Sequence, residues 1–329
     1  MKSVWPGLGL CFALSAAAIF LAKVPWVEQT IRFGPLLIVI LLGMIVASAF
    51  SVPASLLDGI KFCQKPVLRF GVGLLGIRLA LSEIWKIGLP SMVVVVVATL
   101  ASMVFGVWLA RRMKVEEGMG LLLSTGTAIC GASAIVAADT VVRAKGKDAA
   151  VSLGVITLWG TVGIFIYPWL PDLFGWGHQA YGLFAGATLQ EVAQVVAAGS
   201  AVGPDAQNFA TVVKLERVLL LVPILIGLSA MLSRGNEARE KTPLVPWFLI
   251  MFVVLSGVRT IAESGGYGPW IKAWIEPIVT WALCLGMAGV GLQTGFRDVR
   301  SAGWKPVALG LFQWLFLCTI TVALIRVMP

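Results

Sequence analysis

Two short stretches carry small polar side chains and glycine inside otherwise apolar sequence. The first runs from Gly126 to Ala138 and the second from Gly186 to Ala198, 60 residues further on, and the two align without a gap. Each opens at a glycine and closes on a β-branched pair followed by two alanines. Polar groups at membrane depth are costly unless they line a cavity or a site. We therefore expect the two stretches to form the walls of a substrate site.

The first stretch has the features of a site that binds an anion through its backbone. Its candidate substrate-binding residues are Thr127, Cys130, Gly131 and Ser133. Glycine lets a helix unwind, and the N–H groups at the start of the following helix attract anions. Small residues also let helices pack closely, and for one such residue alone packing is the better explanation. The repetition of the cluster favours a binding site.

The second stretch adds larger polar side chains, Gln190, Glu191 and Gln194. Gln190 and Gln194 are four residues apart and would share one face of a helix, where we expect both to bind substrate. An intramembrane glutamate is expensive and marks a functional site by default. Glu191 is therefore a candidate to carry a coupling proton. A static ion pair with a neighbouring side chain is an equally good interpretation of Glu191.

A pair of cations follows in the next apolar segment. Lys214 and Arg217 are three residues apart and face the same way on a helix. Arg offers a planar fork to an oxyanion and Lys offers a point charge, so we expect both to bind an anionic substrate. The alternative is that both side chains extend to a membrane interface near the helix end, with Glu216 paired to one of them.

The composition is that of an integral membrane protein. Apolar residues make up 59% of the 329 residues, charged residues make up 12%, and the mean hydropathy is +0.94. No long polar stretch could build a catalytic domain outside a membrane. The net charge of +9 is better explained by Lys and Arg beside membrane spans than by a nucleic-acid partner.

The residues that enzymes and metal sites need are sparse. The five cysteines are scattered and odd in number, which argues against a disulfide framework and against a cysteine-based metal site. His178 is the only histidine, and Cys130 and Ser133 have no histidine beside them that could activate a nucleophile. No Gly-rich nucleotide-binding motif is present. We expect neither enzyme activity nor a cofactor.

The elements that must position these residues are apolar segments near the roughly 20 residues that a membrane span requires. Eleven can be marked, at residues 5–22, 33–50, 66–82, 87–110, 118–140, 149–170, 179–200, 210–232, 244–262, 269–293 and 303–327. The fold class is therefore an all-α polytopic membrane protein.

The distribution of Lys and Arg indicates that two of these segments do not simply cross. If all eleven cross, the two sides carry 13 and 10 of these cations. If segments 118–140 and 179–200 enter and return, the three cations between Arg143 and Lys147 change sides, and the counts become 16 and 7. The second arrangement obeys the positive-inside rule much better. We expect both segments to be re-entrant hairpins or broken helices, and the sequence leaves these two forms open.

A second internal similarity indicates a duplicated architecture. Gly76-Ile77-Arg78 recurs as Gly291-Leu292-Gln293, 215 residues later, so segments three and four resemble ten and eleven. Inverted repeats of this kind are typical of secondary transporters. A competing alignment matches segments five and six to ten and eleven. We predict one transmembrane transporter domain over residues 1–329, with a first repeat at 33–170, a second at 179–327 and an extra helix at 5–22.

The motifs together resemble the YeiH-like sulfate exporter family of bacterial inner-membrane proteins. The resemblance rests on Gly126 to Ala138, Leu189 to Gly199, Lys214 to Val218 and the Gly-Leu-x-Thr-x-Phe pattern from Gly291 to Phe296, and it covers nearly the whole chain. It implies export of sulfate or a related sulfur oxyanion. It also implies a frame similar to inverted-repeat transporters of the bile-acid-symporter and sodium/proton-antiporter types. The family commonly has His where this chain has Gln190, which cannot titrate.

These observations predict a secondary transporter, working as an exporter of a small inorganic anion such as sulfate or sulfite by alternating access. A proton- or sodium-coupled carrier of an organic anion is the alternative, and an intramembrane enzyme or a channel fits less well. The expected partners are a small anionic substrate and the lipid bilayer, with homo-oligomerisation left open. The expected location is the bacterial inner membrane, crossed several times.

Overall fold

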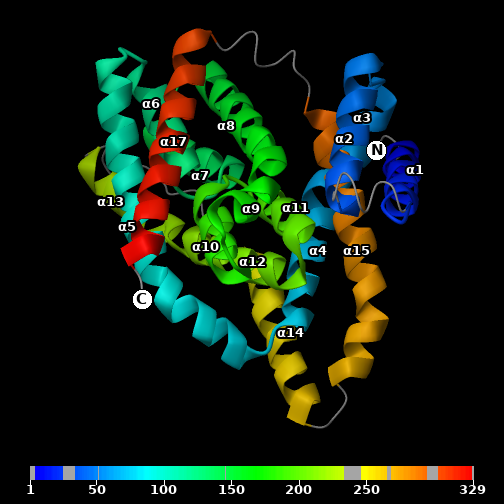
Figure 1. The fold of residues 1–329 in the computed structure, drawn as a ribbon. Helices are drawn as coiled ribbons and strands as arrows, with labels where there is room; N and C mark the ends of the chain where they lie inside the picture. Colours follow the sequence, from blue (N-terminus) through cyan, green and yellow to red (C-terminus); the bar gives the residue numbers. More distant parts are fainter. Residues whose placement is uncertain are drawn as a thin grey trace. The chain divides into compact units, whose positions relative to one another are not determined.

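The structure, a computed structural model, describes residues 4–24, 34–50, 52–144, 146–232, 246–264, 268–294 and 303–327. The regular secondary structure in these ranges is entirely helical (Figure 1), which confirms the predicted all-α class. Gly295 and Phe296 of the Gly-Leu-x-Thr-x-Phe pattern lie outside the described residues. The chain forms two compact units. The first unit comprises Met1–Lys86, Val196–Pro204 and Pro246–Phe296, and the second comprises Ile87–Val195, Asp205–Val245 and Arg297–Pro329.

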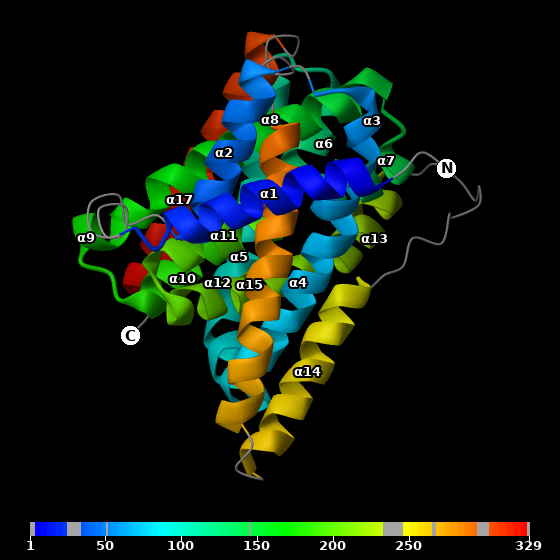
Figure 2. The same ribbon diagram turned by 90° about the vertical axis from the view of Figure 1, so that its right-hand side faces the viewer.

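The first unit is built around one long helix. Helix α15 packs against α1, α2, α4 and α14, and Figure 2 shows α1 crossing it. The elements of this unit are α1 (Trp5–Leu21), α2 (Pro35–Ala49), α3 (Ala54–Phe62), the π-helical turn η2 (Cys63–Val67), α4 (Leu68–Leu74), the 3-10 turn η3 (Leu75–Arg78), α14 (Trp247–Ser264) and α15 (Gly268–Gln293).

Glycines let the helices of this unit meet backbone to backbone. A Cβ atom added to Gly43 would lie 3.0 Å from Cα of Gly291, so α2 and α15 touch at these two residues. A Cβ added to Gly59 would lie 2.7 Å from Cα of Gly7, so α1 and α3 touch in the same way. Close approach through small residues is the usual way in which helices pack inside a membrane.

The second unit holds both polar stretches. Its elements are most of α5 (Leu81–Arg112), α6 (Glu117–Ala128), α7 (Ala132–Val142), α8 (Gly146–Ile166), the 3-10 turn η4 (Tyr167–Trp169), α9 (Leu170–Phe174), α10 (His178–Thr188), the start of α11 (Val192–Val202), α12 (Pro204–Leu219), α13 (Leu221–Met231) and α17 (Trp304–Val327).

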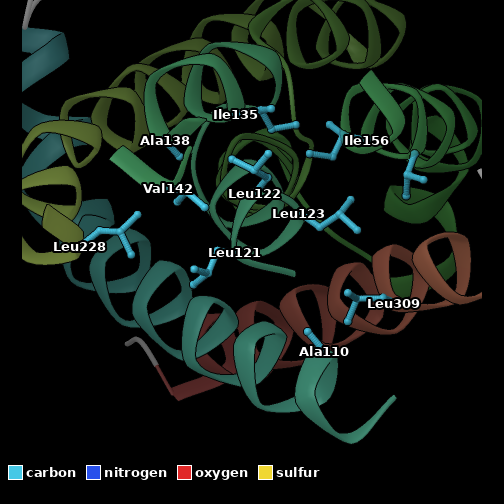
Figure 3. Close-up of a cluster of buried hydrophobic side chains, with 11 residues drawn as sticks. Ala110, Leu121, Leu122, Leu123, Ile135, Ala138, Val142, Ile156, Leu228 and Leu309 are labelled. Carbon is cyan, nitrogen blue, oxygen red and sulfur yellow. The ribbon is translucent and has the colours of Figure 1, made fainter. Parts of the chain in front are cut away.

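The first polar stretch is a helical hairpin. Ala138 and Val142 of α7 belong to the same buried apolar cluster as Leu121 and Leu122 of α6 (Figure 3), so the chain turns back between the two helices. Helices α8, α13 and α17 contribute to this cluster, for example through Ile156 of α8. The hairpin thus has an apolar body, which fixes the position of its polar tip.

Each of the eleven apolar segments overlaps a helix of the structure. Four helical stretches of the described chain are long and apolar enough to cross a membrane, namely Leu81–Arg112, Lys147–Phe174, Trp274–Gln293 and Trp304–Val327. Shorter apolar helices are α1, α2, α7 and α11. Membrane-spanning helices are therefore present, while the count of eleven spans and the inverted repeats stay predictions.

Three segments expected to be single helices are divided, and a proline lies near each division. Segment 149–170 passes from α8 into η4, which contains Pro168. Segment 210–232 is split between α12 and α13 at Leu220, because Pro223 has no N–H to donate to the carbonyl of Leu219. Segment 66–82 is made of η2, α4 and η3, with Pro66 inside the π-helical turn. The division at Leu220 matters for the site, because α12 carries both buried cations, Lys214 and Arg217.

Candidate functional site

The tip of the first hairpin lies between the end of α6 and the start of α7. Gly131 has φ +67°, a left-handed conformation that favours glycine, and its N–H donates to the Gly126 carbonyl over 2.9 Å. The turn leaves the carbonyls of the last residues of α6 without partners inside the helix. It also leaves the first N–H groups of α7 pointing out of the helix start, beside Gly131.

The second polar stretch is broken at the corresponding place. Helix α10 ends at Thr188, Leu189 is extended, and α11 begins at Val192. The Glu191 N–H donates to Oε1 of Gln194 over 2.9 Å, which is one half of a capping box at the start of α11. Gln194 is buried and packs against Gly160 of α8. Its side chain therefore has a structural role in this break, and substrate contact by Gln194 stays a prediction.

Lys214 joins the two breaks. Its Nζ donates to the Ile129 carbonyl over 2.7 Å and to the Leu189 carbonyl over 2.8 Å. The side chain is fully buried, with an exposed fraction of 0%. One ammonium group thus binds the end of α6 and the end of α10 at once.

Arg217 lies one turn further along α12 and repeats the arrangement. Its Nε and Nη2 donate to the carbonyls of Ala128 (3.1 Å) and Thr127 (2.7 Å). Its Nη1 donates to the carbonyls of Leu189 (2.9 Å) and Gly186 (3.4 Å). The guanidinium group is fully buried. Cations at helix C-terminal ends satisfy orphan carbonyls and oppose the negative end of the helix dipole.

This geometry corrects the alternative that Lys214 and Arg217 reach a membrane interface or pair with Glu216. Both side chains point into the protein, and within the described chain neither forms an ion pair with a carboxylate. Their six hydrogen bonds to carbonyl oxygens engage most of the eight N–H donors that the two side chains possess. The remaining two donors are what the pair could offer to a ligand.

Glu191 crosses from the second break to the first. A Cβ added to Gly131 would lie 2.8 Å from Cγ of Glu191, so only glycine leaves room for this side chain. The Ala132 N–H hydrogen bonds to the Glu191 carboxylate, and Lys214 lies close enough to attract it. A carboxylate at the start of a helix is electrostatically favourable. The Glu191 carboxyl group therefore occupies the place where the sequence predicts a bound substrate anion.

The structure brings together eight of the nine predicted site residues and separates one. Around the two breaks lie Thr127, Cys130, Gly131, Gln190, Glu191, Gln194, Lys214 and Arg217. Ser133, at the start of α7, is exposed. Thr127 takes part through its backbone carbonyl. Oε1 of Gln190 is buried and has no hydrogen-bond partner in the part of the chain that the structure describes, so it is an acceptor available inside the site.

Polar residues that are not among the predicted site residues hydrogen bond at or near the helix ends. Tyr167 hydrogen bonds to Thr188 (2.8 Å) at the end of α10 and accepts a hydrogen bond from Trp314 (3.0 Å). Gln313 donates to the carbonyls of Ser102 and Ser124, close to the end of α6. The signal for Gln313 was available in the sequence, because an amide in an apolar segment of this length is unusual.

Comparisons with known proteins agree on one group. Residues 6–310 match the family model described as conserved hypothetical protein 698. A UPF0324 membrane protein of Yersinia pestis is 34% identical over 94% of this chain and 89% of its own length. UPF0324 membrane proteins of Bacillus cereus and Bacteroides thetaiotaomicron are 38% and 33% identical, over 93% and 94% of this chain and 89% and 94% of their own lengths.

Proposed function

The chain belongs to the family described as conserved hypothetical protein 698, whose members named above are membrane proteins, and on this premise we propose that it is a secondary transporter. Its substrate is a small inorganic anion such as sulfate or sulfite, and its direction is export across the bacterial inner membrane. The eleven apolar segments and the inverted repeats predicted from the sequence belong to this proposal.

The observation that carries the proposal is the pair of helix breaks joined by Lys214 and Arg217. Transporters of the inverted-repeat type place broken helices at their binding sites, because helix ends there present unpaired N–H and carbonyl groups to the substrate and the coupling ion. In this chain two buried cations already bind the carbonyl ends. The N–H ends are left for an anion.

The anion site then centres on the start of α7. The Glu191 carboxylate accepts from the Ala132 N–H and is attracted by Lys214. An oxyanion has the same charge sign and the same acceptor chemistry as a carboxylate, so it would replace Glu191 there. We therefore assign Glu191 as the group that substrate must displace, and as the candidate to take up a proton when it leaves.

The same observation keeps the alternative of a cation-coupled carrier of an organic anion. A carboxylate inside the site gives a proton or a sodium ion a binding group next to the substrate. Sulfate and a small organic carboxylate differ in charge and shape, and direct competition between them separates the two substrate classes.

Flux of radiolabelled sulfate and sulfite into proteoliposomes tests the proposal. We expect saturable uptake with counterflow, which a carrier shows and a channel does not. In Glu191→Gln we expect exchange to persist with a weaker dependence on pH. Glu117→Gln is the matched control, because Glu117 is an exposed glutamate in the first turn of α6. Folded wild-type protein that carries neither anion would overturn the sulfur-oxyanion assignment.

A further inference from the structure

A buried carboxylate of this unit lies on the other side of α12. Glu216 is between the two cations in sequence order, but its side chain faces α5 and not the helix breaks. Only 6% of Glu216 is exposed. A Cβ added to Gly88 of α5 would lie 3.0 Å from its Oε1, so the carboxylate lies directly against this helix.

Ser91 is the polar partner of Glu216. Both carboxylate oxygens lie 2.9 Å from Oγ of Ser91. The same Oγ lies 2.7 Å from the carbonyl oxygen of Ile87 and 3.3 Å from that of Gly88. A hydroxyl group has one proton to donate and can accept in addition. Four acceptor oxygens therefore surround a single hydroxyl proton.

The number of protons decides which of these contacts are hydrogen bonds. With Glu216 ionised, Ser91 can donate to the carboxylate, and one carboxylate oxygen keeps no donor. With one proton on Glu216, the carboxyl group donates to Oγ of Ser91 and Ser91 donates to Ile87, so the short distances of 2.9 Å and 2.7 Å are both explained. Leaving a buried charge without partners is costly, and the added proton removes that cost.

Charged groups on the surrounding elements do not take the place of this proton. On its own helix, Lys214 and Arg217 are turned toward the helix breaks. The remaining charged or titratable residues of the packed helices are Glu83, Lys86, Arg111 and Arg112 of α5, His178 and Tyr181 of α10, Asp205 of α12, and Lys305, Cys318 and Arg326 of α17. Within the described chain, Ser91 is the one side chain that hydrogen bonds to the Glu216 carboxylate, and no ion pair reaches it.

We propose that Glu216 and Ser91 form a proton-binding site, and that this proton is coupled to anion movement in addition to a proton that Glu191 takes up. The coupling arises because Glu216 precedes Arg217 on the helix whose cations join both breaks, so a charge change at Glu216 acts on the element that holds the site together. The coupling part rests on the proposed transport function. The presence of a proton on Glu216 does not depend on that function.

Infrared difference spectroscopy of the full chain in lipid nanodiscs tests the proton directly. We expect a carbonyl band of a protonated carboxylic acid at neutral pH, shifted by deuterium exchange and absent in Glu216→Gln. Glu191→Gln is the control and should keep the band. Ser91→Ala should keep it at a higher frequency, because the hydrogen bond to Ser91 is lost. If wild type shows no carboxylic-acid band, or if its band persists in Glu216→Gln, the proposal is overturned.

Two further arms separate the proton from other ions and from failure of the transport proposal. Replacing choline with sodium should leave the band unchanged, and its loss in sodium would overturn the proton in favour of a metal-ion site. In proteoliposomes, a pH gradient should drive wild-type flux more strongly than flux of Glu216→Gln, while exchange at equal pH continues in both. Flux of Glu216→Gln that follows the gradient as strongly as wild type would overturn the coupling role. No flux in wild type would count against the transport function alone, because the band is measured without it.

Discussion

The buried ionisable side chains on the two faces of α12 differ in their hydrogen-bond partners. On one face, Lys214 and Arg217 form six hydrogen bonds to carbonyl oxygens at the ends of α6 and α10. On the other face, Ser91 is the single hydroxyl partner of Glu216 among the described residues. The cations are supported by helix dipoles and by orphan carbonyls, whereas in the described ranges no opposite charge forms an ion pair with the carboxylate. The difference indicates that Lys214 and Arg217 form a fixed joint between the ends of α6 and α10. On the other face, the protonation state of Glu216 can change.

The largest expected effect comes from breaking the joint. Arg217→Ala removes four hydrogen bonds and leaves buried carbonyls of both breaks without donors. We expect a loss of at least about 3 kcal/mol in unfolding free energy, since each unsatisfied buried group costs about 1–3 kcal/mol. Thermal unfolding of the purified protein in detergent measures it. Arg326→Ala, at the exposed end of α17, is the control and should change the midpoint little.

A loss of transport in Arg217→Ala has to be compared with the stability of the same variant. A variant that loses both stability and flux has lost the support of the helix ends, and it says little about direct contact with substrate. Arg217→Lys keeps the charge but can reach fewer of the four carbonyls. If Arg217→Ala were as stable as wild type, the joint would not have the role assigned to it.

An intermediate effect is expected at the tip of the first hairpin. Gly131→Ala places a side chain at φ +67° and 2.8 Å from Cγ of Glu191. We expect a destabilisation of about 1–3 kcal/mol from backbone strain, together with displacement of Glu191. Gly154→Ala is the matched control, because Gly154 is inside helix α8 with open space where its Cβ would be. There alanine should be neutral or stabilising by about 0.5–1 kcal/mol, from helix propensity alone.

The smallest expected effect on stability is on the opposite face. Glu216→Gln keeps the size of the side chain and leaves a group that can both donate to and accept from Ser91. We expect a change of less than about 1 kcal/mol, in the same unfolding assay, because a neutral group replaces a neutral one. A loss as large as that of Arg217→Ala would show that Glu216 is held as a charge, and the contrast between the two faces would fail.

The sequence predicts which residues form the site better than it predicts their hydrogen-bond partners. Both helix breaks were expected, because glycine and small polar residues interrupt apolar segments there. Burial of Lys214 and Arg217 is one of two interpretations that the sequence allows, and their carbonyl partners lie between 25 and 90 residues away in the chain. No periodicity or spacing encodes a contact of that range. The sequence predicts an anion as the partner of the two cations, because backbone carbonyls leave no signal in the sequence.

The same limit applies to the two glutamates. Glu191 stood out because it lies within a repeated motif, yet nothing in the motif indicates that its side chain reaches Gly131 on the other hairpin. Pairing of Glu216 with a neighbouring cation belongs to the alternative interpretation of Lys214 and Arg217, since a salt bridge on one helix is the local solution. Its actual partner, Ser91, is 125 residues away, on a helix whose sequence looks like a plain apolar span.

The central claim is that the Glu191 carboxylate occupies the place of the substrate anion at the start of α7. The most direct measurement is the rise in unfolding temperature with increasing sulfate or sulfite, compared between wild type and Glu191→Gln at the same pH. A ligand that binds only the folded state stabilises it according to its concentration and affinity. We predict that Glu191→Gln responds at lower anion concentration than wild type, because a neutral amide is held at the start of α7 and beside Lys214 less strongly than a carboxylate and is easier for an anion to displace. An equal or weaker response in the variant, with Glu117→Gln unchanged, would contradict the account.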